Sequence, residues 1–329
     1  MKPFISPRSR VAATGLVVLL VLAACGKSSS SSTTTTSQVA ATSTTASATI
    51  ASKLSFGGPP ECPKNAYCIP GLQRVYGITF ASFKALDVGD ALTYAALASG
   101  AVQVAEVFST DGRIADQGLV VLQDDKHLQQ ADNVVPVIRK AKATPAVTQL
   151  INKVSALITT DGLTALNKKV TVDKADPPAV ATTFLQTNGL STKSTALAGV
   201  TLTVGSVNFP ENVLLADIYG QALQAAGANV KIKTSLGTRQ TVEPALQAGQ
   251  IDLLPEYAAS ALEFINHSAG EASGDIANNV AKLTSHMAPL NIVVLDATPA
   301  IDTNAFAVTK ATADKYHLAK MSDLTGPAS

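Results

Sequence analysis

The chain has 329 residues and carries 25 Lys and Arg against 24 Asp and Glu. This balanced charge, without a basic cluster, argues against binding to nucleic acid. Trp is absent, and aromatic residues make up 5% of the chain. The part of the chain beyond residue 51 is long enough for two lobes with a sizeable core.

The first 25 residues predict export from the cytoplasm of a bacterium. Three basic residues within 1–10 precede an apolar run at 11–24, which is too short to span a bilayer but suits the hydrophobic region of a signal peptide. The run ends in LAAC, which resembles the lipobox of bacterial lipoproteins, where the cysteine, here Cys25, is lipidated. The alternative is an ordinary secretory signal with a chance cysteine. We therefore expect a signal peptide over 1–25 and an extracytoplasmic protein anchored to the cell membrane by lipid.

The following segment, 26–51, is rich in Ser and Thr and almost uncharged. It has too little apolar bulk to form a core, so we expect a flexible tether. Cys62 and Cys68 then flank PKNAY. In an exported protein such a pair most simply forms a local disulfide, and a metal site is disfavoured because no histidine lies nearby. We expect neither a metal nor a cofactor.

Both halves of the chain alternate short apolar strands with helical patterns, which is typical of an α/β fold with mainly parallel sheets. In the first half the predicted strands are 53–57, 78–81, 102–108, 119–125 and 133–139, and the predicted helices are 90–100, 145–157, 160–169 and 176–188. A polar joint over 189–199 leads into the second half. There the predicted strands are 200–206, 229–234, 251–257, 291–295 and 304–309, and the predicted helices are 211–226, 240–248, 256–266, 273–287 and 311–316.

Catalytic motifs are absent from the sequence. It contains no G-x-S-x-G, no H-E-x-x-H and no phosphate-binding G-x-x-x-x-G-K, and its four histidines are scattered. A binding protein is therefore favoured over an enzyme.

Several long motifs resemble the substrate-binding proteins of ABC importers for osmoprotectants such as glycine betaine, choline and proline betaine. In the second half these motifs are VGSVNFPEN, GTRQTVEPALQAGQIDLLPEY and DTNAFAVTKATADKYHL followed by SDL. In the first half they are LSFGGPPECPKNAYCIPGLQRVYGI, VQVAEVFSTDGRIADQGLVVLQDDK and FLQTNGL. The resemblance implies a two-lobed, periplasmic-binding-protein-like fold of type II with ligand in the cleft between the lobes.

The order of the two halves departs from that family. There the strand–Gly-Ser–helix segment comes first, whereas here it begins near residue 200. The simplest interpretation is a circular permutation, with the old termini joined by 189–199, because chain termini often lie close together and exposed loops tolerate reopening. The alternative is a fused or truncated gene. Crossings near 107–111 and 300–304 would give one continuous lobe, 109–302, and one split lobe, 52–108 plus 303–329.

The resemblance also implies site residues. Tyr257 falls on the aromatic cage tyrosine of the family, Phe108 falls on an aromatic wall, and Ser260 replaces a threonine that could donate to a carboxylate. A cage suits a quaternary ammonium, which has no N–H to donate but is attracted to aromatic faces. The turn GSVNF, with Ser206 and Asn208, would offer backbone N–H groups to a carboxylate. For Tyr257 the alternative is a buried core tyrosine.

Other positions weaken the expected cage. Asn304 and Ala131 stand where aromatic residues occur in the family, and Val207 and Asn65 stand where cationic residues do. A polar site is therefore equally plausible, and its residues would be Asp302, Asn304, Thr110 and Asp111. Asp111, beside Gly112, could instead cap a helix or turn. Arg239 also matches a family motif, as a ligand contact or as a structural arginine.

The function that the sequence favours is capture of a small quaternary-ammonium or zwitterionic osmolyte and its delivery to the transmembrane subunits of an ABC permease. The alternatives are a solute-sensing receptor domain, or a rearranged or truncated copy without function.

Overall fold

The computed structural model describes residues 48–60, 62–87 and 91–328, which belong to one compact unit, Ala46–Ser329. The expected signal peptide, Cys25 and most of the expected tether lie outside the described residues. No helix among the described residues has both the length and the apolar character needed to cross a membrane.

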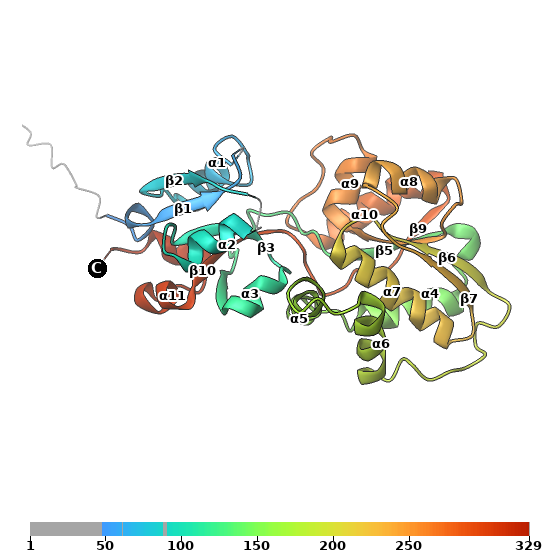
Figure 1. Ribbon diagram of the computed structural model, residues 1–329. Helices are drawn as coiled ribbons and strands as arrows, with labels where there is room; N and C mark the ends of the chain where they lie inside the picture. Colours follow the sequence, from blue (N-terminus) through green and yellow to red (C-terminus); the bar gives the residue numbers. More distant parts are fainter. Residues whose placement is uncertain (1–47, 61, 88–90, 329) are drawn as a thin grey trace, which may run out of the picture. The chain divides into compact units, whose positions relative to one another are not determined.

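The chain forms two five-stranded sheets, each accompanied by helices (Figure 1). The first sheet has the order β2-β1-β3-β10-β4, and its strands are β1 (Ser55–Gly58), β2 (Ser82–Ala85), β3 (Val104–Phe108), β4 (Leu119–Leu122) and β10 (Asn304–Thr309). The second has the order β7-β6-β8-β5-β9, and its strands are β5 (Val134–Arg139), β6 (Thr201–Gly205), β7 (Asn229–Lys233), β8 (Leu253–Tyr257) and β9 (Ile292–Val294).

The two sheets share one plan, in which a strand from the other half of the sequence is inserted antiparallel to its neighbours. In the first sheet β10 runs antiparallel to both β3 and β4. In the second, β5 runs antiparallel to both β8 and β9. Four strands of each sheet run in the same direction, as the expectation of mainly parallel sheets requires. The fifth strand, β10 or β5, runs in the opposite direction.

Helices connect the parallel strands, as crossover connections require, and others link β5 to β6 or follow β10. They are α1 (Ile69–Gly71), α2 (Ala91–Ala98), α3 (Gly112–Gln117), α4 (Pro145–Ser155), α5 (Thr160–Thr171), α6 (Pro177–Thr187), α7 (Pro210–Ala225), α8 (Arg239–Gln247), α9 (Ala258–Ile265), α10 (Ile276–Met287) and α11 (Lys310–Tyr316). Their starts follow local sequence: the side chains of Thr144, Thr159, Asp275 and Thr309 each accept a backbone N–H in the first turn of the helix that follows.

The first crossing between the sheets lies later in the chain than the sequence analysis expects. After β3 the chain forms α3 and returns to the first sheet as β4, which pairs with β10. The chain therefore leaves the first sheet after residue 122 and enters the second at residue 134, and residues 109–122 do not belong to the continuous lobe. The second crossing, between β9 and β10, includes the expected 300–304.

Two segments expected to be flexible or simply polar are packed. Ile50 and Ala51, at the end of the expected tether, are buried. The joint over 189–199 buries Leu190 and Leu197, and the Leu197 N–H donates to the carbonyl of Ala226 just beyond α7. Apolar side chains at both places supply the reason, because their burial removes apolar surface from water.

Candidate functional site

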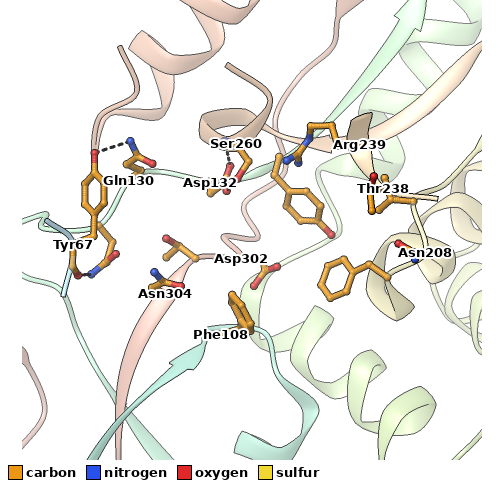
Figure 2. A pocket seen from close by; sticks show the side chains of 15 residues that line it. Tyr67, Phe108, Gln130, Asp132, Asn208, Thr238, Arg239, Ser260, Asp302 and Asn304 are labelled. Atoms are coloured by element: carbon orange, nitrogen blue, oxygen red, sulfur yellow. Dashed lines mark hydrogen bonds between the residues drawn. The ribbon is translucent and has the colours of Figure 1, made fainter. Parts of the chain in front are cut away.

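A cavity of about 420 Å³ collects most of the expected site residues (Figure 2). Both crossing segments contribute to it, together with the carboxyl end of β8 and the turn before α7. Its lining residues are Tyr67, Phe108, Gln129, Gln130, Asp132, Val207, Asn208, Phe209, Thr238, Arg239, Tyr257, Ser260, Asp302, Thr303 and Asn304. In Figure 2, Tyr67 and Gln130 lie at one end and Asn208 and Thr238 at the other, with Asp302 between them.

Four aromatic side chains face this cavity, more than the one or two that the sequence analysis expects. Tyr257 and Phe209 lie with ring centroids 6.2 Å apart and planes inclined by 52°. Phe108 enters from the end of β3, and Tyr67 from the loop after Cys62, where its hydroxyl accepts a hydrogen bond of 2.8 Å from Gln130 Nε2. Neither Tyr67 nor Phe209 is predicted as a wall, because each reaches the cavity through tertiary contacts.

Tyr257 combines the two roles that the sequence left open. Its side chain is buried, and its hydroxyl donates to Glu211 Oε1 over 2.8 Å. Glu211 also accepts a hydrogen bond from Asn167 Nδ2. Burial raises the pKa of Tyr257 well above its ordinary value, with a further contribution from the charge of Glu211. The phenol therefore stays protonated, and its ring is fixed as one wall of the cavity.

Asp132, which the sequence analysis did not single out, is held by Ser260. The Ser260 N–H donates to Asp132 Oδ1 over 2.9 Å, and the Ser260 hydroxyl donates to Oδ2. Burial raises the pKa of Asp132, and the two bonds from Ser260 oppose that rise. The expected donation from Ser260 to a ligand carboxylate is contradicted, because its hydroxyl proton is already directed at Asp132.

Asp302 is a second carboxylate on the cavity wall. Its Oδ1 accepts a hydrogen bond of 2.9 Å from the Thr110 hydroxyl. Burial, and then the charge of nearby Glu211, raise the pKa of Asp302 well above its ordinary value. Of the four residues of the expected polar site, Asp302 and Asn304 line this cavity, whereas Thr110 and Asp111 line a neighbouring one.

Arg239 lines the cavity, but its guanidinium forms an ion pair with Glu256. Its Nε lies 3.0 Å from both carboxylate oxygens of Glu256, and its Nη2 lies 2.8 Å from Oε2. The Glu256 side chain is 2% exposed, so this pair is a buried neighbour of the site and not a free cation. Arg239 therefore has the structural role that the sequence analysis left open, at a position that also touches the cavity.

The turn before α7 does not present the expected backbone donors. The N–H groups of Ser206, Val207 and Asn208 donate to Lys233 O, to Asn212 Oδ1 and to Gly237 O, respectively. Ser206 itself is buried, and its hydroxyl accepts from the Ser235 N–H. Asn208 lines the cavity with its side chain. The sequence motif predicted the turn, but only the tertiary structure shows that its donors are already used.

A family model for the substrate-binding domain of ABC-type glycine betaine transport systems matches residues 30–187 and 200–329. The chain belongs to this family. Its members serve transport, which is not an enzyme activity.

Curated relatives match this family member over parts of their length. The chain is 33% identical over 122 residues to the ergothioneine transport permease/ergothioneine binding protein EgtU of Helicobacter pylori. This match covers 36% of this chain and 22% of that protein. It is 31% identical over 123 residues to a glycine-betaine-binding protein of Pseudomonas aeruginosa (36% and 39%), and 32% identical over 117 residues to the carnitine transport binding protein OpuCC of Listeria monocytogenes (35% and 37%). These matches thus span two fifths or less of each relative.

Solved structures of binding proteins give weaker likenesses. An ancestral arginine-binding protein bound to arginine is 13% identical with a TM-score of 0.35, and the match covers 83% of this chain and 91% of that one. The periplasmic aliphatic sulphonate binding protein SsuA of Escherichia coli is 12% identical with a TM-score of 0.36, covering 80% and 63%. Values this low carry no information about the ligand.

Four expected residues, one of them the buried Ser206 described above, are not among the residues that line the main cavity. Thr110 and Asp111 line a neighbouring cavity of about 250 Å³. Asp111 caps α3 by accepting the Arg113 N–H over 2.9 Å, which is the alternative that the sequence analysis kept for it. Asn65 faces its own loop and accepts the Tyr67 N–H over 2.9 Å.

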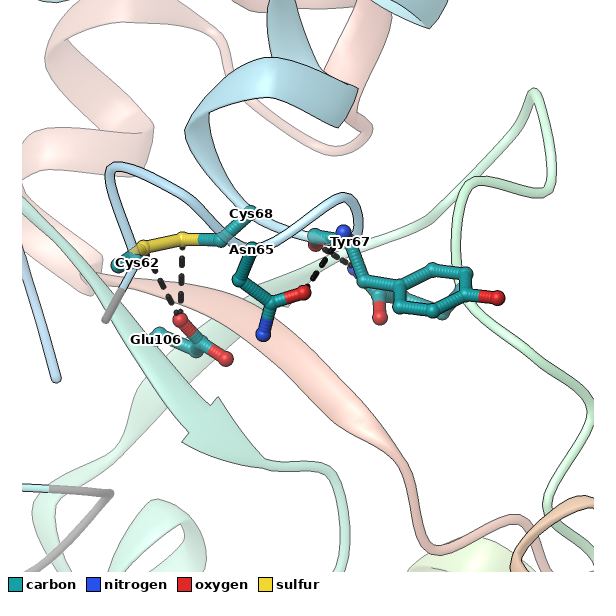
Figure 3. The surroundings of a disulfide bond; sticks show 6 residues. Cys62, Asn65, Tyr67, Cys68 and Glu106 are labelled. Atoms are coloured by element: carbon teal, nitrogen blue, oxygen red, sulfur yellow. Dashed lines mark hydrogen bonds between the residues drawn. A yellow bond between two sulfur atoms is a disulfide. The ribbon is translucent and has the colours of Figure 1, made fainter. Parts of the chain in front are cut away.

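Cys62 and Cys68 are joined by a disulfide that closes the loop carrying Tyr67 (Figure 3). Both cysteines are buried, and Glu106 Oε2 on β3 lies 3.3 Å from Cys62 Sγ and 3.1 Å from Cys68 Sγ. The base of the loop therefore lies against β3 of the first sheet, while Tyr67 extends from the loop to the cavity.

Proposed function

We propose that this protein is an extracytoplasmic solute-binding protein of an ABC importer, which captures a small osmolyte with a quaternary ammonium group. The observation that carries the proposal is the joint presence of four aromatic walls and two carboxylates around one cavity of about 420 Å³. Aromatic faces and carboxylates both attract a cation that cannot donate hydrogen bonds. Family membership supports the same function.

The proposal includes delivery of the ligand to a permease. Proteins of this family serve an ABC-type transport system, and the relative from Helicobacter pylori is named as an ergothioneine transport permease/ergothioneine binding protein. We propose that the transmembrane subunits of a permease are the partner here. We also propose that 1–25 is a lipoprotein signal peptide and that Cys25 carries the anchor, since the basic start, the apolar run and LAAC agree with one another.

We further propose that the chain is a circular permutation of the family fold. The proximity of the two ends of the described chain supports this: the Ile50 N–H donates to Gly326 O over 2.9 Å, and the Ala328 N–H donates to Ala48 O over 2.8 Å. Each sheet also takes its antiparallel strand from the other half of the sequence. The contrast between a family match over most of the chain and relatives matching about 120 residues fits a reordered chain.

Calorimetric titration tests the proposed function with glycine betaine, choline and carnitine. We expect at least one to bind, and we expect Tyr257→Ala to weaken that binding about tenfold or more through loss of the cation–π wall. Tyr316→Ala, on α11 outside the cavity, is the matched control and should leave the affinity unchanged. Failure of all three compounds to bind the wild-type protein would refute the proposal.

A further inference from the structure

The charges around the cavity do not balance. Two carboxylates, Asp132 and Asp302, line it, and among the described lining residues Arg239 is the single basic side chain. Glu256 holds that guanidinium through contacts of 2.8 to 3.0 Å. The ion pair cancels the positive charge of Arg239, so the two aspartates give the cavity a net negative charge when they are ionised.

Asp302 has capacity for a bound cation. Thr110 donates to Oδ1 over 2.9 Å, and no described residue donates to Oδ2. The side chain is only partly accessible and lies on the cavity wall, with Phe108 and Asn304 near it (Figure 2). A partly desolvated carboxylate beside other acids is stabilised most by a positive charge placed against its unused oxygen.

The groups that the sequence analysis expects to hold a carboxylate are already engaged. The N–H groups of Ser206, Val207 and Asn208 each donate to another part of the protein. The Ser260 hydroxyl donates to Asp132. A ligand carboxylate in this cavity would therefore meet two aspartates and no unpaired basic side chain among the described lining residues, so its desolvation would be poorly compensated.

We propose that the site selects net-positive ligands without a carboxylate, such as a trimethylammonium alcohol, over zwitterionic betaines. This inference rests on the proposed function and narrows its ligand class. The ammonium group lies among the aromatic walls and beside Asp302, while the amide and hydroxyl groups of Asn208, Thr238 and Asn304 suit a neutral hydroxyl at the other end of the ligand.

The test compares choline with glycine betaine, because both carry the same trimethylammonium group and differ at the alcohol or carboxylate end. By calorimetry at one pH and one salt concentration, we expect choline to bind the wild-type protein at least about tenfold more tightly than betaine. Equal affinities, or tighter binding of betaine, would overturn the inference and leave the proposed function intact. Binding of neither compound, nor of carnitine, would overturn both.

The Asp302→Asn variant tests whether Asp302 causes the preference for choline over betaine. The amide keeps an acceptor for Thr110 but cannot ionise against a bound cation, so choline should bind at least about fivefold more weakly and the choline-to-betaine preference should shrink. Asp161→Asn removes one exposed charge on α5 and should leave the preference unchanged. An unchanged preference in Asp302→Asn, with a wild-type thermal unfolding curve, would contradict the role of Asp302.

Discussion

A carboxylic acid next to the site, but not in it, shows how one residue can set the pH dependence of stability. Glu243 on α8 is 1% exposed, and neither of its carboxyl oxygens has a hydrogen-bond partner among the described residues. Burial and then the charge of Glu256 raise its pKa to about 7, against small opposing effects of Arg239 and the Gln247 amide. The folded protein therefore favours the protonated form more than the unfolded chain does.

The sign of the effect follows from this raised pKa. The stabilisation due to Glu243 is fully present below the unfolded-state pKa and is lost as the pH rises through about 7. At pH 8 the charge costs roughly 3 kcal/mol, from about 1.4 kcal/mol per pKa unit. Glu243→Gln should therefore raise the free energy of unfolding in urea at pH 8 by up to about that amount and change it little at pH 4.5.

A matched control for this prediction is Asp314→Asn. The Asp314 side chain is 65% exposed, and such surface charges contribute little to stability. Asp314→Asn should leave the difference in the free energy of unfolding between pH 8 and pH 4.5 as it is in the wild-type protein. If Glu243→Gln has the same pH profile as this control, the carboxyl group is not charged at a cost in the folded state.

At the scale of elements, the loop between Cys62 and Cys68 connects a structural bond to the ligand site. The disulfide joins the ends of the loop, Glu106 lies against both sulfurs, and Tyr67 reaches Gln130 at the cavity. The sequence favours the disulfide from spacing and export, but it does not indicate that the residue before Cys68 would form a wall. That wall exists because the first crossing, 123–133, passes beside the loop.

Removal of the disulfide should therefore affect both stability and binding. In the double variant Cys62→Ala and Cys68→Ala, the free energy of unfolding should fall by roughly 2 kcal/mol, the chain-entropy value for so short a loop. Binding of the ligand identified by titration should also weaken, because Tyr67 is less restrained. Reductant should produce the same changes in the wild-type protein and none in the variant. If the reduced wild-type protein and the double variant both unfold as the oxidised wild-type protein does, the prediction is contradicted.

Elements with strong local patterns are predicted well from the sequence, whereas short ones are not. The predicted strand at 304–309 coincides with β10, and the predicted helix at 211–226 differs from α7 by one residue at each end. The missed α3 has six residues and begins at Gly112, so its periodicity is too short to detect. Missing it displaced the expected lobe boundary, because α3 returns the chain to the first sheet.

For the whole molecule, each sheet depends on strands from both halves of the sequence. Strand β5 lies between β8 and β9, and β10 lies between β3 and β4. Residues 197–329 alone therefore lack β5, which joins β8 to β9, and both partners of β10. We expect this fragment to show no cooperative unfolding transition in urea, because the unpaired edges of β8, β9 and β10 would face solvent.

The control for the fragment is a reordered full chain in which residues 200–328 precede 48–187 and a short linker joins 328 to 48. The pairing of Ile50 with Gly326 brings these ends together, so the reordered chain should unfold cooperatively and keep the ligand preference of the wild-type protein. Stable, cooperative folding of the fragment by itself would contradict the permuted architecture.

The sequence by itself determined the α/β class, nearly all the long elements, and the motifs that contain Tyr257, Asp302, Asn304 and Phe108, which line the cavity. Local periodicity, turn residues and family motifs carry that information without reference to distant parts of the chain. Only the tertiary structure decided which donors and charges remain for a ligand. The Ser260 hydroxyl and the Arg239 guanidinium are engaged by partners 128 and 17 residues away, Asp132 and Glu256. The N–H groups of the turn are engaged by Asn212, Lys233 and Gly237.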